Sequence, residues 1–226
     1  MTVWPNKGMF YAVEGIDGAG SSMQARLLYE HLIASGFSVY LTHEPSNGPV
    51  GQHLRRLLRG EGVSAMSPES MALLFAADRM QHAHLDIVPR LQRGDHVICD
   101  RYVLSSLVYQ GLDLPLAWVE QINRHAPPPD VTILIDTPSP QAAQRRAQRG
   151  GPTEIFDSDT LQHRLRERYV ALLPPDGIRL DGTAAPRAIF RQLLSRLQAK
   201  GLLPVPRARV PFSSPAASEQ PAPMAT

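Results

Sequence analysis

Five short apolar runs recur along the chain and predict β-strands. Within the runs the apolar positions are largely continuous rather than alternating, as expected for parallel strands that helices cover on both faces. The predicted strands span residues 9–14, 37–42, 96–99, 131–135 and 178–180.

The segments between these runs have the apolar spacing of helices. In the first segment, Leu28 and Leu32 belong to an apolar stripe that Gly36 ends. The longest helical pattern is interrupted or kinked near Pro89. Strands that alternate with helices predict βαβ units, and therefore an α/β fold in three layers with about five parallel strands. The predicted helices span residues 21–35, 68–93, 116–124, 140–149, 160–173 and 186–199.

Composition divides the chain into one domain and two end segments. From about Pro204 onward Pro, Ala and Ser dominate, so we predict a disordered tail over 204–226. Residues 1–8 are predicted as a short N-terminal extension, and 9–203 as the domain. The polar, glycine-containing insert 150–157 is consistent with either a lid or an ordinary loop.

Charge and cysteine content limit the classes of partner and compartment. The formal net charge of +2 gives little support to nucleic-acid binding. The single cysteine, Cys99, cannot form an internal disulfide, which fits a reducing cytoplasm. No signal peptide is evident, and no segment approaches the roughly 18 consecutive apolar residues of a membrane span. Only Lys7 and Lys200 are lysines among the basic residues; arginine suits phosphate recognition, although genome composition explains most of this usage.

A glycine-rich segment follows the first predicted strand and opens the first predicted helix. Its backbone N–H groups and the helix N-terminus can hold a phosphate, as in the pattern G-x-x-x-x-G-K-[ST]. Ser22 stands where the hydroxyl that binds magnesium is expected, but Ser21 occupies the lysine position. The alternative is a plain glycine-rich turn. The predicted phosphate-binding residues are Gly15, Gly18, Ala19, Gly20, Ser21 and Ser22.

One predicted helix carries a candidate mononucleotide grip. Phe75, Arg79 and His82 are spaced i, i+4 and i+7, so they share one helix face. A ring can stack on a base while a guanidinium binds a phosphate. The alternative is a half-exposed helix with a surface arginine.

A second candidate lies at the end of the strand 96–99. Asp100 and Arg101 follow this strand, and parallel sheets place ligand sites at the carboxyl ends of their strands. The acid can orient magnesium, and the arginine can reach a transferring phosphoryl group. A structural strand-end pair is the alternative. We take Asp100 and Arg101 as candidate catalytic residues, with Ser22 and Asp100 as candidate metal ligands.

Four segments together resemble the thymidylate kinase family of P-loop nucleoside monophosphate kinases. They are Glu14–Gly20, His43-Glu44-Pro45, Leu74–Arg79 with His82, and Asp100-Arg101-Tyr102 followed by Ser105, Ser106, Tyr109 and Gln110. The resemblance covers about residues 9–199, and the last two segments are specific to this family. It implies a P-loop NTPase fold with a short lid, ATP as donor, dTMP as acceptor, Mg²⁺ and a homodimer.

The same resemblance matches Asp17 with an acidic family position near the acceptor, which makes it a candidate catalytic residue; the alternative is an acid that forms a turn or starts a helix. It also assigns residues to the two nucleotide sites. On the adenine side it points to Arg145 or Arg149, and Thr183 follows the last strand where it could line the adenine pocket. The implied dTMP-binding residues are Glu44, Phe75, Arg79, Arg101, Ser105, Ser106, Tyr109 and Gln110.

The chain departs from the family pattern at its phosphate loop. The lysine is absent, and neither the loop interior nor the segment 151–156 contains the catalytic arginine that family members supply. Arg79, Arg101 and Arg145 are the candidates to compensate. Two rival hypotheses follow: a kinase of the same fold with another acceptor, such as dUMP or a deoxynucleoside, or a nucleotide-binding protein that has lost catalysis.

Overall fold

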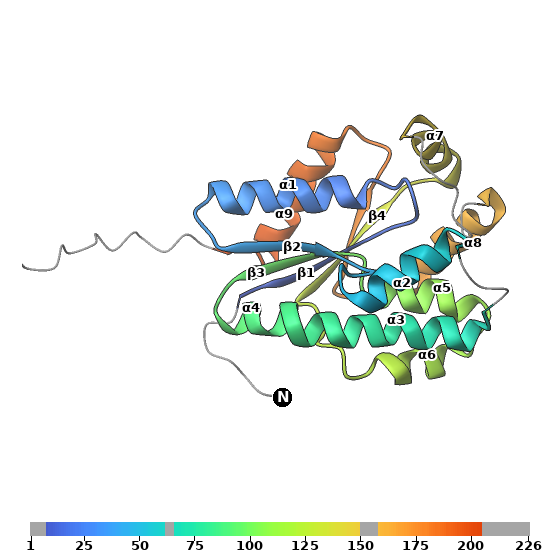
Figure 1. Cartoon of the computed structure of the whole chain (residues 1–226). Coiled ribbons are helices and arrows are strands. Elements are labelled where there is room, and N and C mark those ends of the chain that lie inside the picture. Colours follow the sequence, from blue (N-terminus) through green and yellow to red (C-terminus); the bar gives the residue numbers. More distant parts are fainter. Residues whose placement is uncertain (1–7, 62–65, 150–157, 205–226) are drawn as a thin grey trace, which may run out of the picture.

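A single parallel sheet organises the molecule (Figure 1). The computed structural model describes residues 8–61, 66–149 and 158–204. Its five strands lie in the order β2-β3-β1-β4-β5, and all neighbouring pairs are parallel, as predicted. The strands are β1 (Phe10–Glu14), β2 (Val39–His43), β3 (His96–Asp100), β4 (Val131–Asp136) and β5 (Ile178–Asp181).

Helices cover both faces of the sheet, which gives the expected three layers. Figure 1 shows α1 and α9 on one side and α3, α4, α5 and α6 on the other. Buried side chains of both layers, such as Leu28 of α1 and Leu104 of α5, join the strands in the core. The helices are α1 (Ser21–Ala34), α2 (Pro49–Leu58), α3 (Pro68–His82), α4 (Val88–Gln92), α5 (Val103–Tyr109), α6 (Leu116–Asn123), α7 (Ser139–Arg149), α8 (Asp159–Leu172) and α9 (Pro186–Ala199).

Strand register brings the polar strand ends to one edge of the sheet. Asp100 at the end of β3 pairs with Val13 of β1 on one side and with His43 of β2 on the other. The loop after β1 and the segments after β2 and β3 therefore begin at the same level. This alignment places the candidate site at the carboxyl edge of the sheet.

The long helical pattern contains a widened turn. Residues 68–93 form α3, a π-helical turn at Ala83–Ile87, and α4. Pro89 has no N–H to donate to the carbonyl of Leu85, so the regular hydrogen-bond ladder cannot continue through this point. The predicted interruption near Pro89 is confirmed, and it takes the form of a wider turn. Helix α2 was not among the predicted helices.

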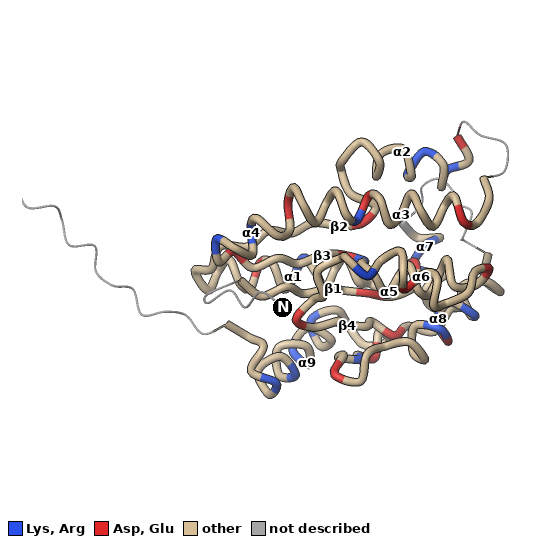
Figure 2. Tube along the Cα trace, turned by 90° about the horizontal axis from the view of Figure 1, so that it is seen from below, with Lys and Arg blue, Asp and Glu red and all other residues tan. Residues whose placement is uncertain are grey.

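The described helices carry mixed charge. Figure 2 shows basic and acidic residues interspersed along them. In the described ranges, no helix is both long enough and apolar enough to cross a membrane. The predicted N-terminal extension, the insert 150–157 and the tail lie, apart from Gly8 and Pro204, outside the described residues.

Candidate active site

The phosphate loop connects β1 to α1 and needs its glycines. Gly18 and Gly20 have positive φ angles of 84° and 101°, a region that side chains rarely adopt. A Cβ on Gly18 would lie 2.3 Å from the carbonyl oxygen of Ala142 in α7. The loop is therefore curved tightly and packed directly against α7, with Gly20 preceding the first turn of α1.

Ser22 and Asp100 come together as the candidate metal ligands. The Ser22 hydroxyl donates to Oδ2 of Asp100. The other carboxylate oxygen, Oδ1 of Asp100, is buried and has no hydrogen-bond partner within the described structure. A hydroxyl and an unpartnered carboxylate oxygen are hard ligands of the kind that Mg²⁺ prefers, so these residues fit the ion.

Arg101 lies between the phosphate loop and α8. Its φ of 70° is the only positive φ of a non-glycine residue in the described ranges. Nη2 donates to Oδ1 of Asp17 at 2.6 Å, and Nη1 donates to the hydroxyls of Tyr169 at 3.0 Å and Tyr109 at 3.3 Å. Burial acts to raise the pKa of Asp17, but Arg101 and the hydrogen bonds of Gln162 and Tyr109 lower it below its usual value. Asp17 is thus held as a carboxylate against the Arg101 guanidinium.

Glu14 stabilises the segment that follows β3. It is fully buried, and it accepts hydrogen bonds from the backbone N–H of Tyr102 at 2.9 Å and from the hydroxyl of Ser105 at 2.6 Å. Burial raises its pKa, against the opposing effects of Ser105 and Arg101. The sequence marked Glu14 only as part of a motif; its buried position and its partners after β3 required the fold.

A cavity of about 670 Å³ opens at the carboxyl edge of the sheet. It brings together every residue predicted for the acceptor, although these residues come from three separate segments. It also reaches Asp17, Ser22 and Asp100. The predicted acceptor residues in its wall are Glu44, Phe75, Arg79, Arg101, Ser105, Ser106, Tyr109 and Gln110.

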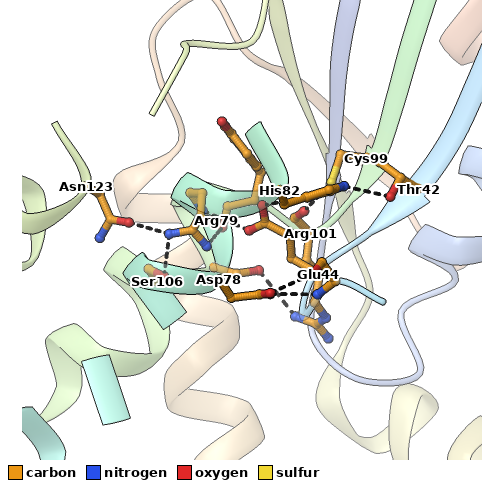
Figure 3. Close-up of polar contacts among 12 residues, drawn as sticks. Thr42, Glu44, Asp78, Arg79, His82, Cys99, Arg101, Ser106 and Asn123 are labelled. Atoms are coloured by element: carbon orange, nitrogen blue, oxygen red, sulfur yellow. Dashed lines mark hydrogen bonds and ion pairs between the residues drawn. The ribbon is translucent and has the colours of Figure 1, made fainter. Parts of the chain in front are cut away.

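Arg79 is bound to protein groups on several sides (Figure 3). Its side chain is buried, and Nε donates to Oε2 of Glu44 at 2.8 Å. Nη1 donates to Ser106 at 2.9 Å and to Oδ1 of Asn123, while Nη2 donates to the carbonyl of Tyr102 at 3.1 Å. Contact with an acceptor phosphate therefore stays a prediction; the observed partner of this cation is Glu44.

His82 and Cys99 complete the polar cluster around Glu44 (Figure 3). The two ring nitrogens of His82 lie 3.2 Å from Oε1 of Glu44 and 2.8 Å from the hydroxyl of Thr42. Glu44, His82 and Cys99 have donor atoms within 4.8 Å of one another. The Cys99 thiol, whose pKa burial raises well above its usual range, donates to the carbonyl of Arg101. Because each group has a partner and Arg79 neutralises Glu44, the cluster fits a structural role better than a metal site.

Sequence reasoning missed the contribution of α2. Arg55 of α2 lines the cavity and donates to the carbonyl of Ser46 at 2.5 Å. Asp78, next to Arg79 in α3, accepts from the backbone N–H of Ser46 at 2.6 Å. These contacts hold the segment after Glu44 against the cavity. The predicted helix pattern left α2 out, so no signal pointed to Arg55.

On the donor side, Arg145 joins two loops. Nη1 donates to the carbonyl of Ala19 in the phosphate loop at 3.0 Å, and Nη2 donates to the carbonyl of Gly182 after β5 at 2.9 Å. Thr183 follows Gly182 and is exposed. The side chain of Arg149 lies outside the described residues. Arg146, which the sequence did not single out, donates to the carbonyl of Asp17 at 2.7 Å.

Comparison with known proteins points to one family. The family model described as thymidylate kinase matches residues 13–191. A probable thymidylate kinase of Pyrococcus horikoshii is 44% identical over 172 residues, covering 74% of this chain and 83% of the relative. A probable thymidylate kinase of Thermococcus onnurineus is 46% identical over 173 residues, covering 73% and 83%. A thymidylate kinase of Xanthomonas euvesicatoria is 39% identical over 186 residues, covering 82% and 81%.

The match includes the phosphate loop, the cavity wall and the arginines of α7, so it spans the whole candidate site. With a parallel five-stranded sheet and a phosphate loop after its first strand, this chain belongs to the thymidylate kinase family.

Proposed function

We propose that the chain transfers the γ-phosphoryl group of ATP to dTMP and releases dTDP and ADP. The observation that carries this proposal is the single cavity that joins the phosphate loop, Asp100 and the acceptor residues. The names of the relatives supply the acceptor, because thymidylate is dTMP. The product dTDP would serve dTTP synthesis, and a cytoplasmic location stays a prediction.

The residues suggest a direct transfer. The donor's phosphates would lie on the N–H groups of the phosphate loop and the N-terminus of α1. An oxygen of the acceptor phosphate forms a bond to the γ-phosphorus while the bond to the β,γ-bridging oxygen breaks. Arg101, held at Asp17, lies where it can stabilise the transferring group. Ser22 and Asp100 would hold Mg²⁺, which supplies charge neutralisation when bound.

Phe75 and Gln110 suggest how the acceptor base is held. Phe75 is half-buried in the cavity wall and offers a ring for stacking. Gln110 is buried in the same wall, and its Oε1 has no hydrogen-bond partner within the described residues. An unpartnered buried acceptor favours a ligand that donates a hydrogen bond to it, as a pyrimidine N–H can.

A coupled assay of ADP release tests the proposal. Purified protein is given ATP, Mg²⁺ and one acceptor at a time: dTMP, dUMP, other monophosphates and thymidine. We expect the highest kcat/KM with dTMP and no turnover when chelator removes the metal. Preference for another acceptor would establish the rival kinase. Binding of both nucleotides without dTDP under any metal condition would refute the kinase assignment.

We further propose that the chain forms a homodimer through α3. Leu73, Met80 and Leu85 expose 50%, 37% and 59% of their surface on or just after this helix. We take these exposed apolar side chains as part of the proposed interface. A second copy of the chain is the partner that the family resemblance implies.

A further inference from the structure

The phosphate loop of this chain has no lysine, so another group must balance the charge of the donor's phosphates. Ser21 occupies the lysine position. Two arginines near the cavity are already neutralised by carboxylates: Arg101 pairs with Asp17 at 2.6 Å, and Arg79 pairs with Glu44 at 2.8 Å. Each of these two arginines therefore already has a carboxylate that offsets its positive charge.

Arg145 of α7 differs from both. Its guanidinium donates to two main-chain carbonyls, those of Ala19 and Gly182, at 3.0 and 2.9 Å. Carbonyl oxygens hold the group in place without cancelling its unit charge. Arg145 therefore combines a fixed position at the phosphate loop with two neutral partners.

Arg145 lies beside Gly20, the residue before the position where the lysine is missing. Its Nη1 lies 3.8 Å from the point that a Cβ on Gly20 would occupy, and Gly20 directly precedes Ser21. The loop turns its N–H groups toward the phosphate and its carbonyls outward. Arg145 and its neighbour Arg146 hold these outward carbonyls, at Ala19 and Asp17.

We propose that Arg145 replaces the phosphate-loop lysine from outside the loop. It acts as a positioning residue: it fixes the curvature of the loop at Ala19, and its charge adds to the positive potential of the α1 N-terminus at the donor's phosphates. Because it also holds Gly182, it connects the loop to the segment after β5. The inference rests on the proposed donor site but not on the identity of the acceptor.

A mutant cycle in donor binding tests the proposal. The affinity for a non-hydrolysable ATP analogue with Mg²⁺ is measured by calorimetry, without acceptor. Arg145→Gln should weaken this affinity by about 10-fold or more, the usual worth of a charge-assisted contact. Arg196→Gln removes the same charge from an exposed position in the last turn of α9 and should leave the affinity unchanged.

Ser21→Lys decides whether the arginine replaces the lysine. In the Arg145→Gln background, Ser21→Lys should restore the affinity to within about 3-fold of wild type, close to the error of additivity. In wild type it should bring little gain, because the two cations would repel each other. An equal gain in both backgrounds, or no loss in Arg145→Gln, would overturn the proposal. So would a loss that Ser21→Lys does not restore, since Arg145 would then be purely structural.

Arg145→Lys covers the case in which Arg145→Gln does not fold, as judged by thermal melting. The lysine keeps the charge but cannot reach both carbonyls in the fork geometry of arginine. We expect it to lose less than about 10-fold in affinity; a larger loss in a folded variant would refute the role of the charge. Because only the donor analogue is present, a failure here is distinct from a failure to phosphorylate dTMP.

Discussion

Arg79 carries its positive charge at a position that water barely reaches, with 1% of the residue exposed. Its carboxylate partner Glu44 is also buried, and His82 and Asn123 are among the polar groups that contact the pair. A buried ion pair contributes little net stability, but the removal of one partner leaves the other charge without compensation. The wall of the acceptor cavity therefore depends on this pair even without a nucleotide.

Arg79→Ala should lower the free energy of unfolding by about 3–5 kcal/mol, because it leaves Glu44 buried and unpaired. Urea denaturation at pH 7 measures the change. Glu44→Gln in the same chain should recover much of the loss, and Arg124→Ala, at an exposed position, serves as the control.

The same Arg79→Ala variant should also use dTMP less well: the free energy calculated from its kcat/KM for dTMP should weaken by at least about 1.5–3 kcal/mol. The affinity for an ATP analogue should change little. Unchanged stability would show that Glu44 finds another partner, and unchanged dTMP kinetics would remove Arg79 from the acceptor site.

Glu14 should make stability depend on pH in the opposite direction to an acid whose pKa the fold lowers, such as Asp17. Burial raises its pKa above the usual 4.5, so the folded chain keeps a proton that the unfolded chain has already released. Stability from this group therefore falls as the pH rises from 4.5 through the folded pKa. Urea denaturation from pH 5 to pH 8 should show wild type losing stability relative to Glu14→Gln. A constant difference between the two proteins would contradict the raised pKa.

At the scale of a single helix, the outer face of α3 stays exposed when one chain folds by itself. Leu73 and Met80 are separated by two helical turns, so they lie on the same face. Other residues of the same helix, Ala72, Ala76 and Arg79 among them, are buried. The helix thus has one face in the protein interior and an exposed apolar stripe that a second copy can cover.

Met80→Glu should convert the proposed dimer to monomer, because a charge would be buried in an apolar interface. Sedimentation velocity at micromolar concentration measures the mass. Gln198→Glu adds the same charge at an exposed position of α9 and should leave the dimer intact. A wild-type protein that sediments only as a monomer would contradict the proposed dimer itself.

The whole chain should tolerate removal of its Pro-, Ala- and Ser-rich end. Residues after Pro204 contain few of the large apolar side chains that stabilise a docked segment. A protein ending at Pro204 should keep its Tm and its dTMP kinase rate close to those of the full chain. Differential scanning calorimetry and the ADP-release assay measure the two quantities, and a marked loss in either would assign the tail a packing or catalytic role.

At the scale of the molecule, the site exists because parallel strands end together. Ser22, Asp100 and Phe75 lie far apart in the chain, yet one cavity contains all three. The register that pairs Asp100 with both Val13 and His43 creates this proximity. Motifs singled out the predicted acceptor residues one segment at a time, and the structure places them around one cavity; their contact with dTMP stays a prediction.

Apolar spacing and glycine placement are local properties, so the sequence was enough to predict the five strands, most helices and the phosphate loop. It did not predict α2, which contains Gly51, and glycine inside a helix lowers helix propensity. A Cβ at Gly51 would lie 2.1 Å from the carbonyl oxygen of Ser46 and 2.8 Å from Asp78. The missing side chain at this position makes room for a tertiary contact and does not reflect local helix propensity.

The partner of each charged side chain became known only from the folded structure. The same residue type, arginine, is neutralised at position 79, held by Asp17 at position 101, and left with carbonyl partners at position 145. Sequence spacing carries no information on these partners, because they come from segments 35, 84 and 126 residues away. Burial and partner together set the energy of a charge, and both are properties of the folded chain.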